Sequence, residues 1–169
     1  MLKVLLGNKI TDVKGYSTVV FQTNGVGVVD QNLLDQIDKD DIIKKEIATL
    51  FKLDKKLFQE GNFFITKPGK LEKNSIESIY FAVLTRLPKS VCSFHNITIS
   101  LNNIFKFAIR KKVKSIAVID FYNTSLGIDM DSVARILVTT SRNYCSSNLD
   151  ILLFATDPSF YESLNKSMI

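Results

Sequence analysis

Hydrophobic residues are distributed along this chain in two alternating patterns. Short runs rich in Val, Ile, Leu and Phe predict strands, and some of these runs are apolar at almost every position. The predicted strands are residues 1–6, 17–22, 62–66, 76–84, 114–121 and 149–154. The intervening segments place apolar residues three and four positions apart, which predicts amphipathic helices. The predicted helices are residues 30–37, 40–51, 129–142 and 157–164, together with one that begins at Thr98 or Ser100.

Several boundary signals accompany these elements. Asp157 is suited to cap the last helix, and Pro158 follows it in the favoured first helical position. Asp40 and Asp41 are expected in the first turn of the second helix, where acids complement the helix dipole. Residues 93–96 are expected to form a loop before the next helix.

Strands that alternate with helices predict an α/β fold, because parallel strands need crossover connections. Runs that are apolar throughout, such as residues 116–119 and 151–154, fit strands that are covered on both faces. We therefore expect a three-layer α/β/α sandwich with a mixed, largely parallel sheet. The 169 residues contain no internal repeat, low-complexity tract or linker, so one domain over residues 1–169 is expected.

Composition narrows the function classes. The hydrophobic fraction of 46% and the charged fraction of 23% are typical of a globular domain. No apolar run reaches the roughly 18 residues of a membrane helix, and no signal peptide is recognised, so a cytoplasmic protein without membrane contact is expected. Cys92 and Cys145 lack metal-site spacing, and His95 has no partner at such spacing. Neither a metal nor another cofactor is expected.

The net charge of +5 suits an anionic partner, and nucleic acid is one candidate. Many lysines, however, alternate with acids along one predicted helical region, as they do on solvated helix faces. The compact basic run is residues 110–114, which falls where a helix should end and where cations complement the helix dipole. We favour this structural role, and nucleic-acid binding through residues 110–114 is the alternative. The abundance of Lys, Asn, Ile and Phe also fits an AT-rich genome, such as that of a phage or a low-GC bacterium.

Two loops carry the candidate chemistry. Residues 19–28 and 115–129 each run from a buried strand into a small polar loop with glycine, and then into a helix. This arrangement places backbone N–H groups and a helix N-terminus at the carboxyl edge of the sheet, which favours phosphate binding. Asn24-Gly25 would also fit a hairpin turn, but a predicted helix follows it. Asp129 is expected to cap its helix rather than to act as a catalytic acid. Together the loops predict the two walls of a nucleotide-diphosphate cleft.

Short sequences along nearly the whole chain follow one order and spacing. They are Q-T-N-G-V-G-V at residues 22–28, G-N-F-F-I-T-K-P-G at 61–69, I-Y-F-A-V-L-T-R at 79–86, K-S-I-A-V at 114–118 and G-I-D-M-D-S-V at 127–133. In this order they resemble the macrodomain family. The similarity is greatest to the branch of antitoxins that remove ADP-ribose from DNA and of hydrolases that cleave ADP-ribosyl-glutamate. That branch commonly has N-T-x-G-V-M-G-K-G-I-A in the first loop and G-L-D-W-E-x-V in the last segment.

The resemblance implies a cleft for ADP-ribose or an ADP-ribosylated macromolecule. By position, Asn24 would face the distal ribose and would be the catalytic candidate. Amides near the diphosphate would come from Gly25, Val26, Gly27 and Val28. The second phosphate loop would consist of Asn123, Thr124, Ser125, Leu126 and Gly127. Asn8 and Thr156 would lie near the adenine.

Departures from the family pattern concentrate in these same loops. Gln31 stands where the family has its lysine, and it cannot act as a nucleophilic amine or as a cation. Asp30 places a negative charge beside the proposed diphosphate. Residues 123–125 replace a glycine-rich loop, which reduces backbone freedom. Asn8 replaces an Asp, and Thr156 offers no stacking surface. Lysine-dependent catalysis is therefore not expected.

Three hypotheses follow. The first is a binding module for ADP-ribose, a related nucleotide or an ADP-ribosylated target, with weak or no catalysis. The second is an ADP-ribosyl hydrolase in which Asn24 orients a water and the substrate ribose. The third is a cleft that binds no ligand, in a fold used for interactions, including with nucleic acid through residues 110–114. The retained Asn24, Gly25, Gly27 and Gly127, beside the lost lysine, favour the first. Tyr122 is the best candidate for an exposed aromatic in the cleft.

Overall fold

One twisted sheet organises the chain. The structure is a computed structural model that describes residues 1–88, 90–122 and 126–169. In these residues six strands form the sheet, in the order β1 (Leu2–Leu6), β6 (Asp150–Ala155), β5 (Ser115–Ile119), β2 (Thr18–Asn24), β4 (Ser78–Thr85) and β3 (Phe63–Thr66). Neighbouring strands run parallel except β3, which pairs antiparallel with β4 at one edge. The sheet is therefore mixed and largely parallel, as predicted.

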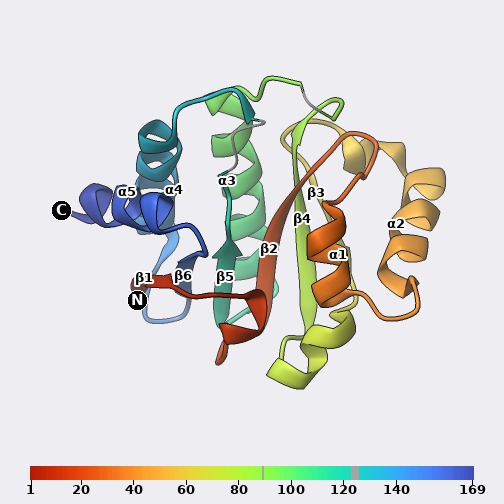
Figure 1. The fold of residues 1–169 in the computed structure, drawn as a ribbon, viewed down its shortest axis with the longest axis horizontal. Helices are drawn as coiled ribbons and strands as arrows, with labels where there is room; N and C mark the ends of the chain where they lie inside the picture. Colours follow the sequence, from red (N-terminus) through yellow and green to blue (C-terminus); the bar gives the residue numbers. More distant parts are fainter. Residues whose placement is uncertain (89, 123–125) are drawn as a thin grey trace.

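Helices cover both faces of this sheet (Figure 1). One face carries α3 (Phe94–Arg110), α4 (Met130–Tyr144) and α5 (Pro158–Met168). The other carries α1 (Gln31–Ile37) and α2 (Ile42–Leu53), with the short 3₁₀ turns η1 (Ile10–Asp12), η2 (Lys55–Phe58) and η3 (Gly69–Asn74). The predicted three-layer α/β/α sandwich is confirmed. Within these described segments, no helix has the length and apolar character needed to cross a membrane.

Burial on both faces explains the apolar strands. Along β2, Val20 packs with the cluster under α3 and α4, whereas Val19 and Phe21 pack with the cluster under α1 and α2. The aromatic side chains Phe64 and Phe81 are buried in the second cluster, with ring centroids 5.3 Å apart. Each such fully buried large side chain stabilises the fold by about 1.5–3 kcal/mol. The two clusters therefore cover the two faces of the sheet.

The start of α3 differs from the prediction. Residues 93–96 do not form a loop, because Ser93 caps a helix that begins at Phe94. The Ser93 hydroxyl accepts the backbone N–H of Asn96 at 3.1 Å, which satisfies one of the free donors of the first turn. The first buried apolar residue of this helix is Ile97. Apolar periodicity therefore begins one turn after the helix itself.

The start of α2 also differs from the prediction. Asp40 and Asp41 both have φ near +57°, in the left-handed region, so neither lies in the first helical turn. The Asp38 carboxylate instead accepts the N–H groups of Ile43 at 2.9 Å and Lys44 at 3.1 Å. The acid that serves this helix N-terminus is therefore Asp38, three residues before Asp41.

Candidate functional site

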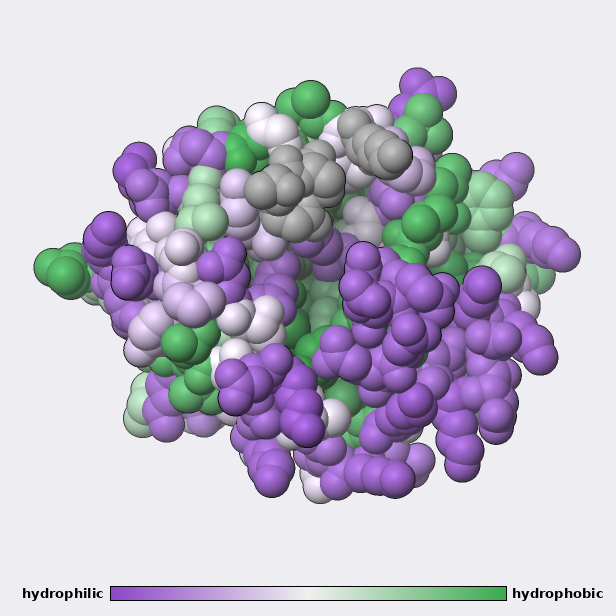
Figure 2. Space-filling model, viewed as in Figure 1, coloured by the Kyte–Doolittle hydropathy of each residue, from purple (hydrophilic) through white to green (hydrophobic). Residues whose placement is uncertain are grey.

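A cleft of about 860 Å³ opens at the carboxyl ends of β1, β2, β5 and β6. Figure 2 shows this face of the molecule hollowed near its middle, with hydrophobic residues in the depth and hydrophilic residues around it. The predicted site residues that line the cleft are Asn8, Asn24, Val28, Leu126 and Thr156. Those that do not line it are Gly25, Val26, Gly27 and Gly127. Asn123, Thr124 and Ser125 lie outside the described residues.

The Asn24 side chain organises the first loop. Its Oδ1 accepts the backbone N–H groups of Val26 at 3.1 Å and Val28 at 3.2 Å. Its Nδ2 donates to the Val28 carbonyl at 3.2 Å. Asn24 is only 8% exposed, and it continues β2 through a register shift between Thr23 and Asn24. Its amide group is thus bonded to its own loop, although the residue borders the cleft.

The amides of the first loop are also engaged. Gly25 donates its N–H to the Thr85 carbonyl at 2.8 Å, and Gly27 donates to the Asn24 carbonyl at 3.0 Å. With Val26 and Val28 bonded to Asn24, all four N–H groups of residues 25–28 have partners within the protein. Their expected role near a diphosphate stays a prediction, and it requires the loop to exchange these bonds for bonds to a ligand.

A carboxylate occupies the helix N-terminus beside this loop. Asp30 caps α1 and accepts the N–H of Leu33 at 3.1 Å. Asp30 also lines the cleft. The Gln31 side chain donates to Asp35 at 2.8 Å along the exposed side of α1, and Gln31 is not a lining residue. The helix N-terminus that would attract a phosphate is therefore already served by an internal anion.

Asp120 follows β5 directly and lines the cleft. It was not among the site residues predicted from the sequence. Its backbone is left-handed, with φ of 42°, and its N–H donates to the Phe154 carbonyl at 2.9 Å. Its carboxylate accepts two hydrogen bonds of 2.7 Å, from the N–H and the hydroxyl of Thr156. Burial raises the pKa of Asp120, against the lowering effect of those bonds, and neighbouring Asp157 raises it further. The sequence feature that could have indicated Asp120 is its place as the first polar residue after the apolar run 116–119.

The loop after β1 brings Asn8 to the cleft. Asp12 accepts the N–H groups of Asn8 at 2.8 Å and Lys9 at 3.1 Å. These two bonds lower the pKa of the Asp12 carboxyl. The exposed Asn8 side chain makes no hydrogen bond to the described part of the chain. It can therefore face a ligand without first leaving an internal partner.

The second wall is held by the segment before α3 and by α4. The carbonyl of Leu126 accepts the N–H of Cys92 at 2.8 Å, and the Leu126 side chain is buried. Asp129 caps α4 by accepting the N–H of Ser132 at 2.9 Å, which confirms its predicted capping role. Tyr122 lines the cleft, and its ring packs against Phe160 at 5.6 Å between centroids.

Charge in the cleft is mainly acidic. Among the described residues that line it, the carboxylates are those of Asp30, Asp120 and Asp157, and the cation is Lys9. Across the described residues, no group of three or more potential metal ligands comes together. An acidic lining repels a diphosphate and weakens anion binding.

Thiol chemistry is also disfavoured at this end of the molecule. Cys92 is buried and its Sγ donates to the Leu84 carbonyl at 3.4 Å. Burial raises the pKa of the Cys92 thiol to about 11. The reactive thiolate is therefore scarce near neutral pH.

Comparison with known proteins identifies the fold. No protein-family model matches the sequence, and no curated protein matches it. Among solved structures, the Oceanobacillus iheyensis macrodomain with ADP has a TM-score of 0.78 at 15% identity, over 99% of this chain and 89% of that chain. The macrodomain of Mycobacterium tuberculosis DarG has a TM-score of 0.68 at 17% identity, over 91% of this chain and 97% of that chain. The macro domain of ganglioside induced differentiation associated protein 2 has a TM-score of 0.74 at 15% identity, over 99% of this chain and 84% of that chain.

These matches establish the macrodomain fold. At 15–17% identity they carry the fold alone and do not select the antitoxin and hydrolase branch. The cleft must therefore be interpreted from its own residues.

Proposed function

We propose that this protein binds ADP-ribose, a related nucleotide or an ADP-ribosylated macromolecule in the cleft, with weak or no turnover. The observation that carries this proposal is the cleft of about 860 Å³ at the carboxyl ends of the parallel strands, whose lining includes Asn8, Asn24 and Thr156. Clefts at this edge of α/β sheets are preferred ligand sites. Solved structures of the same fold include the Oceanobacillus iheyensis macrodomain with ADP and a mutant of that macrodomain with ADPR.

Weak affinity is expected from the acidic walls. Asp30 occupies the N-terminus of α1, and Asp120 and Asp157 also line the cleft. The N–H groups of residues 25–28 are already bonded, so a diphosphate must compete for them. Each of these features reduces the electrostatic gain from binding an anion.

Weak or absent turnover is expected from the missing chemistry. Gln31 stands in place of a lysine and bonds Asp35 outside the cleft. The Asn24 amide, which would have to orient a water, is held by three bonds to its own loop. The three carboxylates that line the cleft already accept hydrogen bonds within the protein: Asp120 accepts two from Thr156, and Asp30 and Asp157 each accept a backbone N–H at a helix N-terminus.

Isothermal titration calorimetry with ADP-ribose and with adenosine tests binding. We expect ADP-ribose to bind with a Kd of about 0.1–1 mM. Asn8→Ala should weaken binding, while Lys73→Ala, an exposed site outside the cleft, should leave it unchanged. Absence of binding heat at millimolar ADP-ribose would contradict the proposal.

The hydrolase hypothesis is tested separately with ADP-ribosylated protein and ADP-ribosylated DNA. We expect little or no release of ADP-ribose above a buffer control. Efficient release that Asn24→Ala abolishes in a folded variant would establish the enzyme instead of the binding module.

A further inference from the structure

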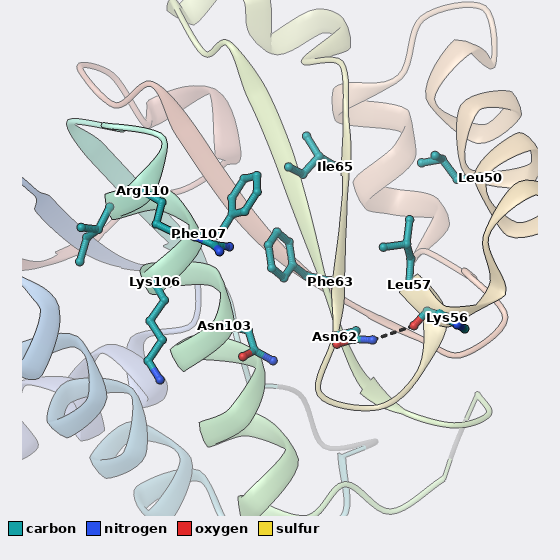
Figure 3. Close-up of a pocket in the computed structure, with 11 residues that line it drawn as sticks. Leu50, Lys56, Leu57, Asn62, Phe63, Ile65, Asn103, Lys106, Phe107 and Arg110 are labelled. Atoms are coloured by element: carbon teal, nitrogen blue, oxygen red, sulfur yellow. Dashed lines mark hydrogen bonds between the residues drawn. The ribbon is translucent and has the colours of Figure 1, made fainter.

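A second groove, separate from the cleft, runs along the edge of the sheet at β3. It encloses about 970 Å³ between the end of α3 on one side and α2 and η2 on the other (Figure 3). Its apolar lining comprises Leu50, Leu57, Phe63, Ile65, Phe107 and Ile109. Within the described part of the chain, it shares no lining residue with the cleft at the carboxyl ends of the strands.

The floor of this groove is an unpaired strand edge. β3 is the last strand of the sheet, and it pairs with β4 on one side only, as far as the described residues extend. The Asn62 carbonyl accepts the N–H of Val83, so it points toward β4. Backbone groups alternate in direction along a strand, which turns the N–H and C=O groups of Phe63 and Ile65 toward the groove. These groups are a template for another strand.

The two walls would receive alternate side chains of an added strand. Phe63 and Ile65 pack on the α3 side of the sheet, together with Phe107. Leu50 and Leu57 belong to the opposite hydrophobic cluster, beside α2. Side chains of a strand paired with β3 would point alternately toward these two walls. Figure 3 shows the two sets of side chains on either side of β3.

Positive charge surrounds the groove. Lys56, Lys106 and Arg110 line it and are exposed, and none of its described lining residues is acidic. Asn103 donates to the Gly61 carbonyl at 2.9 Å, and Asn62 donates to the Lys56 carbonyl at 2.7 Å. Among the described residues, the salt bridge observed is between the N-terminal amino group and Asp150, and it does not involve these three cations. The three cations are therefore available to acidic groups of a partner.

We propose that β3 binds an extended acidic segment of a partner protein by strand addition. Main-chain hydrogen bonds to Phe63 and Ile65 would supply affinity, and the apolar residues of either wall would accept apolar side chains from the face of the added strand that points to that wall. Lys56, Lys106 and Arg110 would select acidic residues in the same segment. This partner site does not depend on what binds in the cleft.

The aromatic arrangement favours a peptide over single-stranded nucleic acid. The Phe63 ring stacks on Tyr80 at 5.5 Å and meets Phe107 edge-on at 5.4 Å. Arg110 and Lys111 lie over the Phe107 ring, each 5.7 Å from its centroid. Base stacking needs free aromatic faces, and both rings already contact other side chains of the protein, Phe63 through Tyr80 and Phe107 through Arg110 and Lys111.

Fluorescence anisotropy with a labelled peptide of about eight residues, alternating Glu and Val, tests the proposal on the full chain. We expect saturable binding that weakens with salt. The double variant Lys106→Glu with Arg110→Glu should bind at least about tenfold more weakly. Lys3→Glu, on the opposite edge strand β1, should bind within about twofold of the parent protein. Both variants change exposed positions, and circular dichroism verifies that they are folded.

A peptide with proline at alternate positions serves as the backbone control, because proline removes the N–H groups needed for strand pairing. It should bind at least about tenfold more weakly than the parent peptide. Three results would overturn the proposal. They are equal affinity for the proline peptide and the parent peptide, an equal loss of peptide affinity in Lys3→Glu and in the double variant, and no binding at millimolar peptide. Tighter binding of oligo-dT than of the peptide, lost in the double variant, would also overturn it in favour of nucleic acid.

Discussion

Replacement of Asn24 by Ala should lower the free energy of unfolding by about 2–4 kcal/mol, because each hydrogen bond contributes about 0.5–1.5 kcal/mol net. Three bonds of 3.1–3.2 Å are lost, two accepted by Oδ1 and one donated by Nδ2. Asn24 is 8% exposed, so water replaces these bonds poorly. Urea unfolding followed by circular dichroism measures the change as a lower midpoint with an unchanged slope.

Two further variants sharpen this test. Asn24→Asp keeps the two accepted bonds but turns an oxygen toward the Val28 carbonyl, so its stability should lie between those of the parent and Asn24→Ala. Gln22→Ala is the matched control on the same strand, because Gln22 makes a single long bond of 3.5 Å to the Asp120 carbonyl. Gln22→Ala should lower the free energy of unfolding by less than about 1 kcal/mol. A free energy of unfolding for Asn24→Ala within about 0.5 kcal/mol of that of the parent protein would refute the view that Asn24 stabilises the loop.

Three other predictions concern the same end of the molecule. Gly25→Ala should destabilise by about 1–3 kcal/mol in urea unfolding, because a Cβ there would lie 2.4 Å from the Arg86 carbonyl oxygen; an unchanged midpoint would contradict this packing. The raised pKa of Asp120 means that its ionisation opposes folding, so its contribution to stability falls as pH rises above the usual value of 3.8. The stability of Asp120→Asn relative to the parent should therefore increase from pH 4 upward, and a difference independent of pH would exclude the effect. Cys92, with its pKa of about 11, should resist a thiol reagent in the folded protein while the half-buried Cys145 reacts; two equally fast thiols in native protein would contradict the assigned burial.

The sequence predicted the fold well because most of its strands are buried on both faces. Val19 and Val20 face opposite layers of the sandwich, so both positions must be apolar and the strand is easily recognised. The start of α3 was missed because its first turn carries exposed residues, and the cap at Ser93 precedes any apolar periodicity. Local patterns thus locate buried elements better than their polar ends.

The site was predicted only in part, for a different reason. The location of Asn24 at the end of β2 follows from the sequence, but the partners of its amide depend on how the loop closes. Asp120 and Thr156 meet only because β5 and β6 are neighbours in the sheet. Contacts between such distant segments have no signature in a single sequence.

A crystal soaked with ADP-ribose tests the central claim most directly. We predict density for the ligand in the cleft, between Asn24 on one wall and Asp120 on the other, with Asn8 in contact with it. Bound ligand that is intact after the soak would support binding without turnover. Density outside the cleft, or none at millimolar ADP-ribose, would contradict the account.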